Sequence, residues 1–160
     1  MSAARLIDTN LLVYRFDPRD PLKQQIAADV LRAGLADGSA VLAHQSVLEF
    51  VAAVSRPNRE LSGEPILARV DALLEAESLA RQFPVLYPDA EVLSTALRGC
   101  AIYQLSWFDA HLWAYAERFG LPEILSEDFE HGRHYGKVRV VNPFLVAAGS
   151  VQELPALYRS

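Results

Sequence analysis

Four acidic side chains occupy positions in this sequence where their carboxylates could act together. Asp8 and Asp128 each follow a short apolar stretch, and Glu49 and Asp109 each lie near the beginning of a segment with helical spacing. Short apolar stretches that alternate with helical segments predict the strands of a parallel sheet. Because ligands bind such sheets outside the carboxyl ends of the strands, we expect the four acids to converge at that edge.

A cluster of four carboxylates needs positive charge to be stable. Two like charges 4 Å apart repel each other by about 4 kcal/mol at an effective dielectric constant near 20. Hard oxygen ligands suit Mg²⁺ or Mn²⁺, whereas zinc is not expected because the sequence has no Cys/His ligand spacing. Carboxylates can hold two such ions roughly 3.5–4 Å apart, which activates water for attack on a phosphodiester. The acids therefore predict a hydrolytic Mg²⁺ or Mn²⁺ site.

Each acid also has a simpler interpretation. Ser46 and Glu49 are spaced as in a helix capping box, and Ser106 and Asp109 form its close variant with Asp. Asp8 could be an ordinary acid of a turn. Asp128, beside Glu127, could be a solvated charge in a loop. The predicted convergence of all four, rather than any one of them, indicates a functional site.

The spacing of apolar residues predicts the elements that would bring these acids together. Predicted strands cover residues 5–7, 40–43, 85–87, 123–125 and 138–141. Predicted helices cover residues 22–35, 46–55, 65–83, 89–101 and 106–119. Residues 8–14 are expected to continue the first strand into a turn, and residues 56–64 to form a loop. The alternation predicts an α/β fold with a central, mainly parallel sheet of about five strands flanked by helices.

Length and composition fit one globular domain of 160 residues, 51% of them hydrophobic. The net charge of −5 argues against a general nucleic-acid binder, because contacts to phosphate need Lys and Arg. That objection weakens if some of the acids bind cations, which reverse the local field. Cys100 is the only cysteine, so no intrachain disulfide can form and a reducing compartment is expected. With no apolar leader or membrane span in the sequence, we expect a cytoplasmic protein.

Short motifs around the four acids resemble those of PIN domains. Residues 6–10 (LIDTN) resemble the opening motif of the family, an apolar strand followed by D-T-N or D-T-S. Residues 45–50 (QSVLEF) are similar to its second acidic motif, residues 108–110 (FDA) to its third and residues 125–129 (LSEDF) to its fourth. The stretch 138–144 (VRVVNPF) resembles the closing strand of bacterial members. Each motif is short, but all four occur in order across nearly the whole chain.

The resemblance implies a single PIN-like domain over residues 1–160, with a core at about 6–144 and a C-terminal tail at 145–160. It implies a Mg²⁺- or Mn²⁺-dependent ribonuclease that cleaves single-stranded RNA and leaves a 5′-phosphate and a 3′-hydroxyl. It further suggests the VapC group of toxins, which are often homodimers and are inhibited by a small antitoxin protein.

The resemblance also assigns roles to individual residues. The acidic quartet would be Asp8, Glu49, Asp109 and Asp128, which serve as catalytic and metal-binding groups. Asn10 and Ser126 would support them through hydrogen bonds. The fourth acid is the least certain, because Glu127 and Asp128 are adjacent and both offer a carboxylate; alignment with the family motif favours Asp128.

A basic segment follows the last acid. Residues 131–139 (HGRHYGKVR) contain Arg133, Lys137 and Arg139 and no acid, so this loop could hold RNA phosphates beside the carboxylates. Tyr135 or Trp107 could stack on a base. A solvated loop with ordinary surface charges explains the same pattern.

Two other functions remain open at this stage. A phosphatase of the haloacid-dehalogenase class also places an Asp after its first strand, but it needs a second Asp two residues later, where this sequence has Asn10. A PIN-like fold that serves only as a binding module is the non-catalytic alternative. Such modules usually lose one or more of the acids, whereas this chain has an acid at all four positions.

Overall fold

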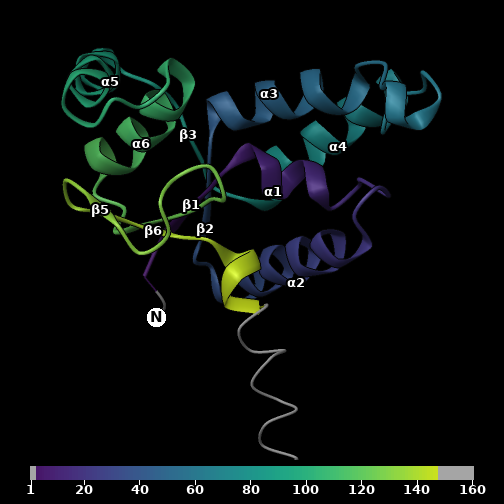
Figure 1. Cartoon of the computed structure of the whole chain (residues 1–160), viewed down its shortest axis with the longest axis horizontal. Helices are drawn as coiled ribbons and strands as arrows, with labels where there is room; N and C mark the ends of the chain where they lie inside the picture. The colour runs from purple at the N-terminus through teal and green to yellow at the C-terminus, as the bar shows by residue number, and fades with distance from the viewer. Residues whose placement is uncertain (1–2, 148–160) are drawn as a thin grey trace, which may run out of the picture.

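Six strands form one sheet in the computed structural model, which describes residues 3–147 (Figure 1). The strands are β1 (Arg5–Ile7), β2 (Ala40–Ala43), β3 (Val85–Leu86), β4 (Glu123–Leu125), β5 (His134–Tyr135) and β6 (Val138–Val141). Their order is β3-β2-β1-β4-β6-β5, and every pairing is parallel except that of β5 with β6. The predicted α/β class and mainly parallel sheet are confirmed.

The strand that the sequence did not predict, β5, lies in the basic segment. This segment forms a hairpin instead of the predicted loop, with Tyr135 paired to Val138. Gly136 opens the two-residue connection at φ 61°, a left-handed conformation that glycine adopts without the steric cost of a Cβ. With only two residues and a histidine, β5 carries no alternating apolar pattern that would have revealed it.

Helices cover both faces of the sheet. They are α1 (Thr9–Tyr14), α2 (Pro21–Asp37), α3 (His44–Ser55), α4 (Arg69–Gln82), α5 (Ala90–Tyr103) and α6 (Trp107–Phe119), with a short 3₁₀ turn, η1 (Arg59–Leu61), between α3 and α4. In Figure 1, α5 and α6 lie at the upper left, above β5 and β6, and α1 to α4 lie to the right of the central strands. The layers are those of a parallel sheet whose connections return over both faces.

Alternation along the central strands divides the apolar core between these two layers. Leu6 and Ile124 pack with α5 and α6, whereas Ile7 and Leu125 pack with the helices of the other face. All four side chains are at most 3% exposed. Because successive side chains of a strand point to opposite faces, two adjacent residues anchor both layers.

Several helix boundaries differ from the sequence-based expectation, and those of α1, α3 and α4 bear on the site. Residues 9–14 form helix α1 and not a turn; a helix of six residues is too short to be stable alone, and buried Leu11 and Leu12 hold it against the core. α3 begins at His44, two residues before its predicted start. α4 begins only at Arg69, because the preceding chain is tied down by a bond from the Leu67 N–H to the Val54 carbonyl (2.9 Å).

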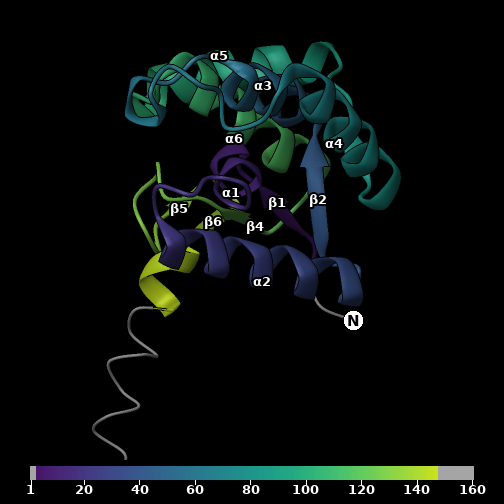
Figure 2. The same cartoon turned by 90° about the vertical axis from the view of Figure 1, so that its right-hand side faces the viewer.

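The carboxyl ends of β1 and β4 lie together in the middle of the sheet. The Asp8 N–H donates to the Leu125 carbonyl (3.0 Å), and the Ser126 N–H donates to the Val141 carbonyl (3.0 Å). These bonds continue the sheet pattern one residue beyond each strand, so Asp8 and Ser126 leave the sheet at neighbouring points. The β2 arrow in Figure 2 points towards this edge, where α3 begins.

The described helices include none that is both long and apolar enough to cross a bilayer. The predicted tail at 145–160 lies largely outside the described residues.

Candidate functional site

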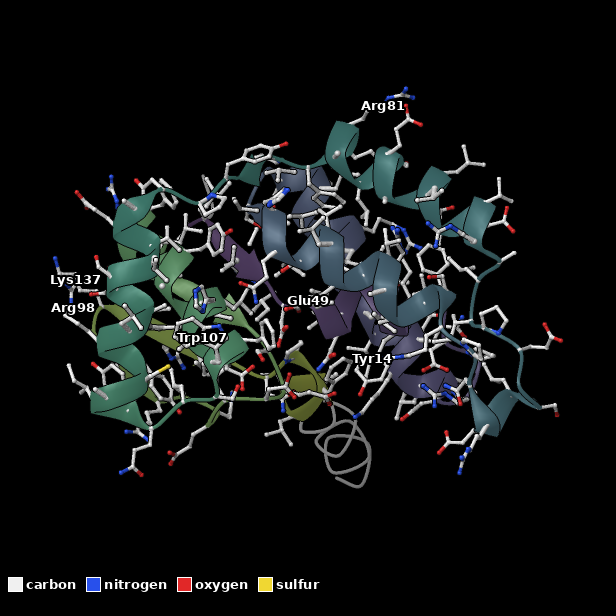
Figure 3. All side chains as sticks on the ribbon, turned by 90° about the horizontal axis from the view of Figure 1, so that it is seen from above. Tyr14, Glu49, Arg81, Arg98, Trp107 and Lys137 are labelled. Atoms are coloured by element: carbon white, nitrogen blue, oxygen red, sulfur yellow. The ribbon has the colours of Figure 1, made fainter. Side chains whose placement is uncertain are left out.

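A cleft of about 390 Å³ at the carboxyl edge of the sheet is lined by all four predicted acids. We call it the acidic cleft; its other lining residues are Thr9, Asn10, Gln45, Ala52, Ala53, Arg56, Phe108 and Leu112. In Figure 3, which looks down onto this edge, Glu49 lies near the centre of the molecule. Four segments that are far apart in the sequence therefore meet in one place, as the topology predicted.

Asp8 and Asp128 are linked by a buried serine. The Ser126 hydroxyl, which is fully buried, donates to Asp8 Oδ2 (2.5 Å) and accepts from the Asp128 N–H (3.0 Å). Asn10 Nδ2 donates to Asp128 Oδ2 (2.8 Å). The two residues predicted to support the acids therefore hold the carboxylates of the first and fourth motifs.

Burial makes the Asp8 carboxylate costly to ionise. Asp8 is 5% exposed, and desolvation raises its pKa to about 7, with further contributions from the negative charges of Asp128 and Asp109 and a partial offset by the Ser126 hydrogen bond. The pKa of Asp128 is also raised, mainly by desolvation. The neighbouring Asp128 carboxyl raises the pKa of Asp8 further, so Asp8 is expected to hold its proton up to about pH 7 in the metal-free protein.

Glu49 is positioned by two residues that the sequence analysis missed. The Thr9 hydroxyl donates to Glu49 Oε2 (2.8 Å), and Gln45 Nε2 donates to Glu49 Oε1 (2.9 Å). Gln45 Nε2 also donates to the carbonyl of Phe108 (3.1 Å), which ties α3 to the first turn of α6. Thr9 lies inside the first motif and Gln45 one helical turn before Glu49, so helical spacing was the signal that could have identified Gln45.

The interpretation of the acids as parts of helix caps is wrong for Glu49 and partly right for Asp109. Ser46 is fully buried inside α3, whose N-cap is Ala43, so Glu49 belongs to no capping box. Ser106 does cap α6, with its hydroxyl accepting from the Asp109 N–H (3.3 Å). The capping bond uses only the backbone of Asp109, and its carboxylate faces the acidic cleft.

The structure separates Glu127 from Asp128. Glu127 accepts hydrogen bonds from the Tyr14 hydroxyl and from Lys23 Nζ (2.7 Å). Lys23 also lies over the rings of Tyr14 and Phe144. Glu127 is therefore engaged beside the cleft with a cation of its own, whereas Asp128 lines the cleft with the other acids.

The acids fit a hard divalent cation in their chemistry, and all four line the same cleft. All four are oxygen donors, and a cation would remove the cost of ionising buried Asp8. Among residues 3–147, no three His, Cys, Asp or Glu side chains already form a group that could hold a metal ion. Mutual repulsion between the carboxylates favours a separation too large for three of them to hold one ion. Binding would draw Asp109 or Glu49 towards the Asp8–Asp128 pair.

The three cations predicted to contact RNA do not line the acidic cleft. Arg133 pairs with Glu130 and lies over Tyr135, and Arg139 lies 3.9 Å from Glu123. Figure 3 shows Lys137 at the left periphery, away from Glu49. The suggested stacking of Tyr135 on a base is wrong, because this side chain is 3% exposed and packs inside the core.

A cation that the sequence analysis missed lies in the cleft. Arg56, one residue beyond the end of α3, is exposed and lines the acidic cleft. Within residues 3–147 it forms no ion pair, unlike most of the other arginines. Its guanidinium is therefore available to an anion that enters beside the four acids.

Comparisons with solved structures agree with this architecture. The chain is similar to a toxin–antitoxin complex from Klebsiella pneumoniae (TM-score 0.62, 16% identity, covering 88% of this chain and 98% of that one). It is also similar to DNA-bound VapBC from Salmonella typhimurium (TM-score 0.63, 13% identity, covering 89% of this chain and 99% of that one). A third neighbour is Mycobacterium tuberculosis VapC20, described as a sarcin–ricin loop cleaving toxin (TM-score 0.59, 14% identity, covering 85% of this chain and 99% of that one). At these identities, the likeness establishes the fold alone.

No curated protein matched the sequence. The family model described as "PIN domain" matches residues 5–137, a range that contains all four acids and the strands that carry them. Together with the six-stranded, mostly parallel sheet, this match shows that the chain belongs to the PIN domain family.

Proposed function

We propose that this protein is a metal-dependent ribonuclease that hydrolyses single-stranded RNA, and that it is the toxin of a toxin–antitoxin pair. The observation that carries the proposal is the acidic cleft itself, where four carboxylates from separate segments meet around buried Asp8. A purely structural role does not explain a carboxyl whose ionisation burial disfavours so strongly.

The acids Asp8, Glu49, Asp109 and Asp128 would hold Mg²⁺ or Mn²⁺. A divalent ion bound there supplies Lewis-acid stabilisation of the phosphoryl oxygens. The surrounding side chains orient the carboxylates: Ser126 fixes Asp8, and Thr9 and Gln45 fix Glu49. Below about pH 7, the proton on Asp8 must leave before its carboxylate can serve as a ligand.

RNA binding to an acidic protein requires local positive charge. Arg56 lines the cleft without an ion-pair partner among the described residues and would contact a phosphate near the scissile bond. Arg133, Lys137 and Arg139, in the β5–β6 hairpin, would at most contact more distant phosphates.

The toxin assignment rests on the neighbours described as a toxin–antitoxin complex and as a sarcin–ricin loop cleaving toxin. A small antitoxin would be the protein partner, and a homodimer the assembled form. Exposed apolar residues support a protein-binding surface; on α4 and α5 they include Val70, Leu73, Leu74, Leu93 and Leu97. Such side chains, when contiguous on a surface, mark sites of association.

Of the two alternative functions, the phosphatase has less support than the non-catalytic PIN module. Membership of the PIN domain family argues against the haloacid-dehalogenase class, and Asn10 serves as a hydrogen-bond donor to Asp128. A non-catalytic PIN module remains the competing hypothesis. It predicts that Asp8→Asn retains every cellular effect of the parent.

The function is tested by incubating the protein with 5′-labelled single-stranded RNA in Mg²⁺, Mn²⁺ or chelator. We expect cleavage with either ion, none with chelator, and products carrying a 5′-phosphate and a 3′-hydroxyl. Asp109→Asn should lower the rate by more than about 100-fold, because altering even an outer-shell partner of a metal ligand costs roughly 10- to 100-fold.

Three results would contradict the proposal. Cleavage that persists in chelator would exclude metal dependence. Products with a 2′,3′-cyclic phosphate would indicate another chemistry. Equal rates for the parent and Asp109→Asn would point to a contaminating nuclease.

The adjacent pair Asp128 and Glu127 provides a matched test of the fourth acid. We expect Asp128→Asn to lower the cleavage rate by roughly 10- to 100-fold or more, because it removes a carboxylate from the cleft. Glu127→Gln should leave the rate close to the parent's and cost at most about 1 kcal/mol of stability, since its partner Lys23 is partly exposed. Single-turnover rates and urea unfolding measure the two effects; the reverse pattern would assign the fourth position to Glu127.

A further inference from the structure

A second hollow adjoins the acidic cleft. It has a volume of about 520 Å³ and lies between α3, the beginning of α5 and α6. We call it the apolar groove; its walls include Leu48, Val92, Leu93, Phe108 and Tyr115. Its volume falls within the roughly 300–1,000 Å³ typical of ligand pockets.

The groove and the cleft share a wall. Gln45, Glu49, Ala52 and Phe108 line both. Any extended ligand whose charged part lies among the acids can therefore place its neighbouring group in the groove. If the proposed function is correct, that ligand is an RNA strand and the neighbouring group is the nucleotide next to the scissile phosphate.

Phe108 is the side chain at the boundary. It directly precedes Asp109 in the first turn of α6 and is 65% exposed. The bonds from Gln45 Nε2 to the Glu49 carboxylate (2.9 Å) and to the Phe108 carbonyl (3.1 Å) fix the Phe108 backbone relative to the acids. The ring is therefore an exposed aromatic surface held at a set position beside the acidic cleft.

The charges of the groove favour an uncharged occupant. The described residues that line it include His44 and His111, Glu49 and Asp89, which is paired with Arg118 (2.9 Å), but no Lys or Arg. The groove therefore offers no Lys or Arg to a phosphate, whereas the unpaired cation Arg56 lies on the wall of the acidic cleft. Backbone phosphate and base are thus assigned to different places, the phosphate to the acidic cleft and a flat, neutral base to the groove.

We propose that the apolar groove binds the nucleobase adjacent to the scissile phosphate, stacked on Phe108. Stacking on an aromatic side chain tolerates any base, and contacts with the remaining walls would set the preference among bases. This proposal rests on the proposed ribonuclease function and adds to it the group that positions the strand.

The test uses short single-stranded RNAs that carry 2-aminopurine, whose fluorescence falls when it stacks. Binding is measured with Mg²⁺ in the Asp8→Asn background, where cleavage is suppressed. We expect quenching on binding, its loss in Phe108→Ala together with roughly 5- to 150-fold weaker binding, and its retention in Phe108→Tyr. Phe119→Ala is the matched control, because Phe119 is an exposed aromatic at the opposite end of the same helix.

Cleavage by proteins with an intact Asp8 provides the second readout. In a random RNA pool, the parent should prefer particular bases at one position beside the cut, and Phe108→Ala should lose this preference with a higher KM and a smaller change in kcat. An unchanged preference and unchanged quenching in Phe108→Ala, with the parent still active, would overturn the groove assignment and leave the proposed function intact.

Two other outcomes would also overturn the groove assignment. A parent that neither binds nor cleaves RNA with divalent ions would remove the proposed function itself. A shift from dimer to monomer in Phe108→Ala, seen by sedimentation without any change in RNA binding, would assign the groove to an interface between copies of the chain.

Discussion

Asp8→Asn is expected to abolish RNA cleavage and, at the same time, to make the metal-free protein more stable at neutral pH. The loss of activity should exceed about 100-fold, because the substitution removes the most buried carboxylate of the cleft. The gain in stability follows from the raised pKa of Asp8, about 7 in the folded protein against an ordinary value of 3.8. The introduced amide can still accept from Ser126 and carries no charge to bury.

The sign of the pH dependence follows from that difference. Below about pH 4, Asp8 is protonated in both the folded and unfolded states, and its ionisation costs nothing. As the pH rises from about 4 to 7, the unfolded chain releases the proton while the folded protein keeps it, so stability is lost. Above pH 7 the whole penalty is present, up to about 4 kcal/mol at 1.36 kcal/mol per pKa unit.

Urea unfolding of the parent and Asp8→Asn at pH 4.5 and pH 8, both in chelator, measures this effect. We expect similar stabilities at pH 4.5 and an advantage of a few kcal/mol for Asp8→Asn at pH 8. Asp20→Asn is the control for loss of an acid outside the cleft; Asp20 caps α2, and because Asn caps a helix about as well as Asp, this change should leave stability nearly unchanged at both pH values. A less stable Asp8→Asn at pH 8 would mean that Asp8 is already ionised and well compensated in the metal-free protein.

Divalent ions should stabilise the parent strongly at pH 8 and weakly at pH 6. An ion at 100 times its dissociation constant stabilises the folded state by about 2.7 kcal/mol, and below pH 7 binding must displace the proton held by Asp8. Below pH 7, each pH unit should therefore weaken binding by up to about tenfold for one displaced proton. Titrations with Mn²⁺ and Mg²⁺, followed by thermal melting, measure this shift.

Two matched variants localise the ion. Asp109→Asn should lose most of the stabilisation, because Asp109 lines the cleft and its charge raises the pKa of both Asp8 and Asp128. Glu127→Gln should respond as the parent does, since Lys23 already neutralises Glu127. NaCl at equal ionic strength controls for screening of the acids. An equal response from parent and Asp109→Asn would place the ion outside the acidic cleft.

The sequence by itself determined the sheet and the candidate acids. Short apolar runs bounded by helical segments located β1, β2, β4 and β6 at their observed positions, because the central residues of these strands are buried in the core. The parallel topology that follows from the alternation of strands and helices then predicted one edge for Asp8, Glu49, Asp109 and Asp128. The cleft contains all four, although their catalytic roles remain predictions.

Only the tertiary structure decided which side chains surround those acids. Glu127 and Asp128 are adjacent and both offer a carboxylate, and only the motif alignment favoured Asp128. The structure separates them because Lys23 and Tyr14, more than 100 positions earlier, engage Glu127. Arg56 lies in the segment expected to be a loop and Phe108 directly precedes the acid of the third motif, and nothing in the sequence indicated that either side chain lines the cleft. Short-range patterns such as strand alternation and helix spacing report local backbone preference. Three features of the site depend instead on contacts between distant segments: the pairing of charges, the depth of burial of Asp8 and the wall shared by cleft and groove. These contacts form only when the sheet and its helices pack together.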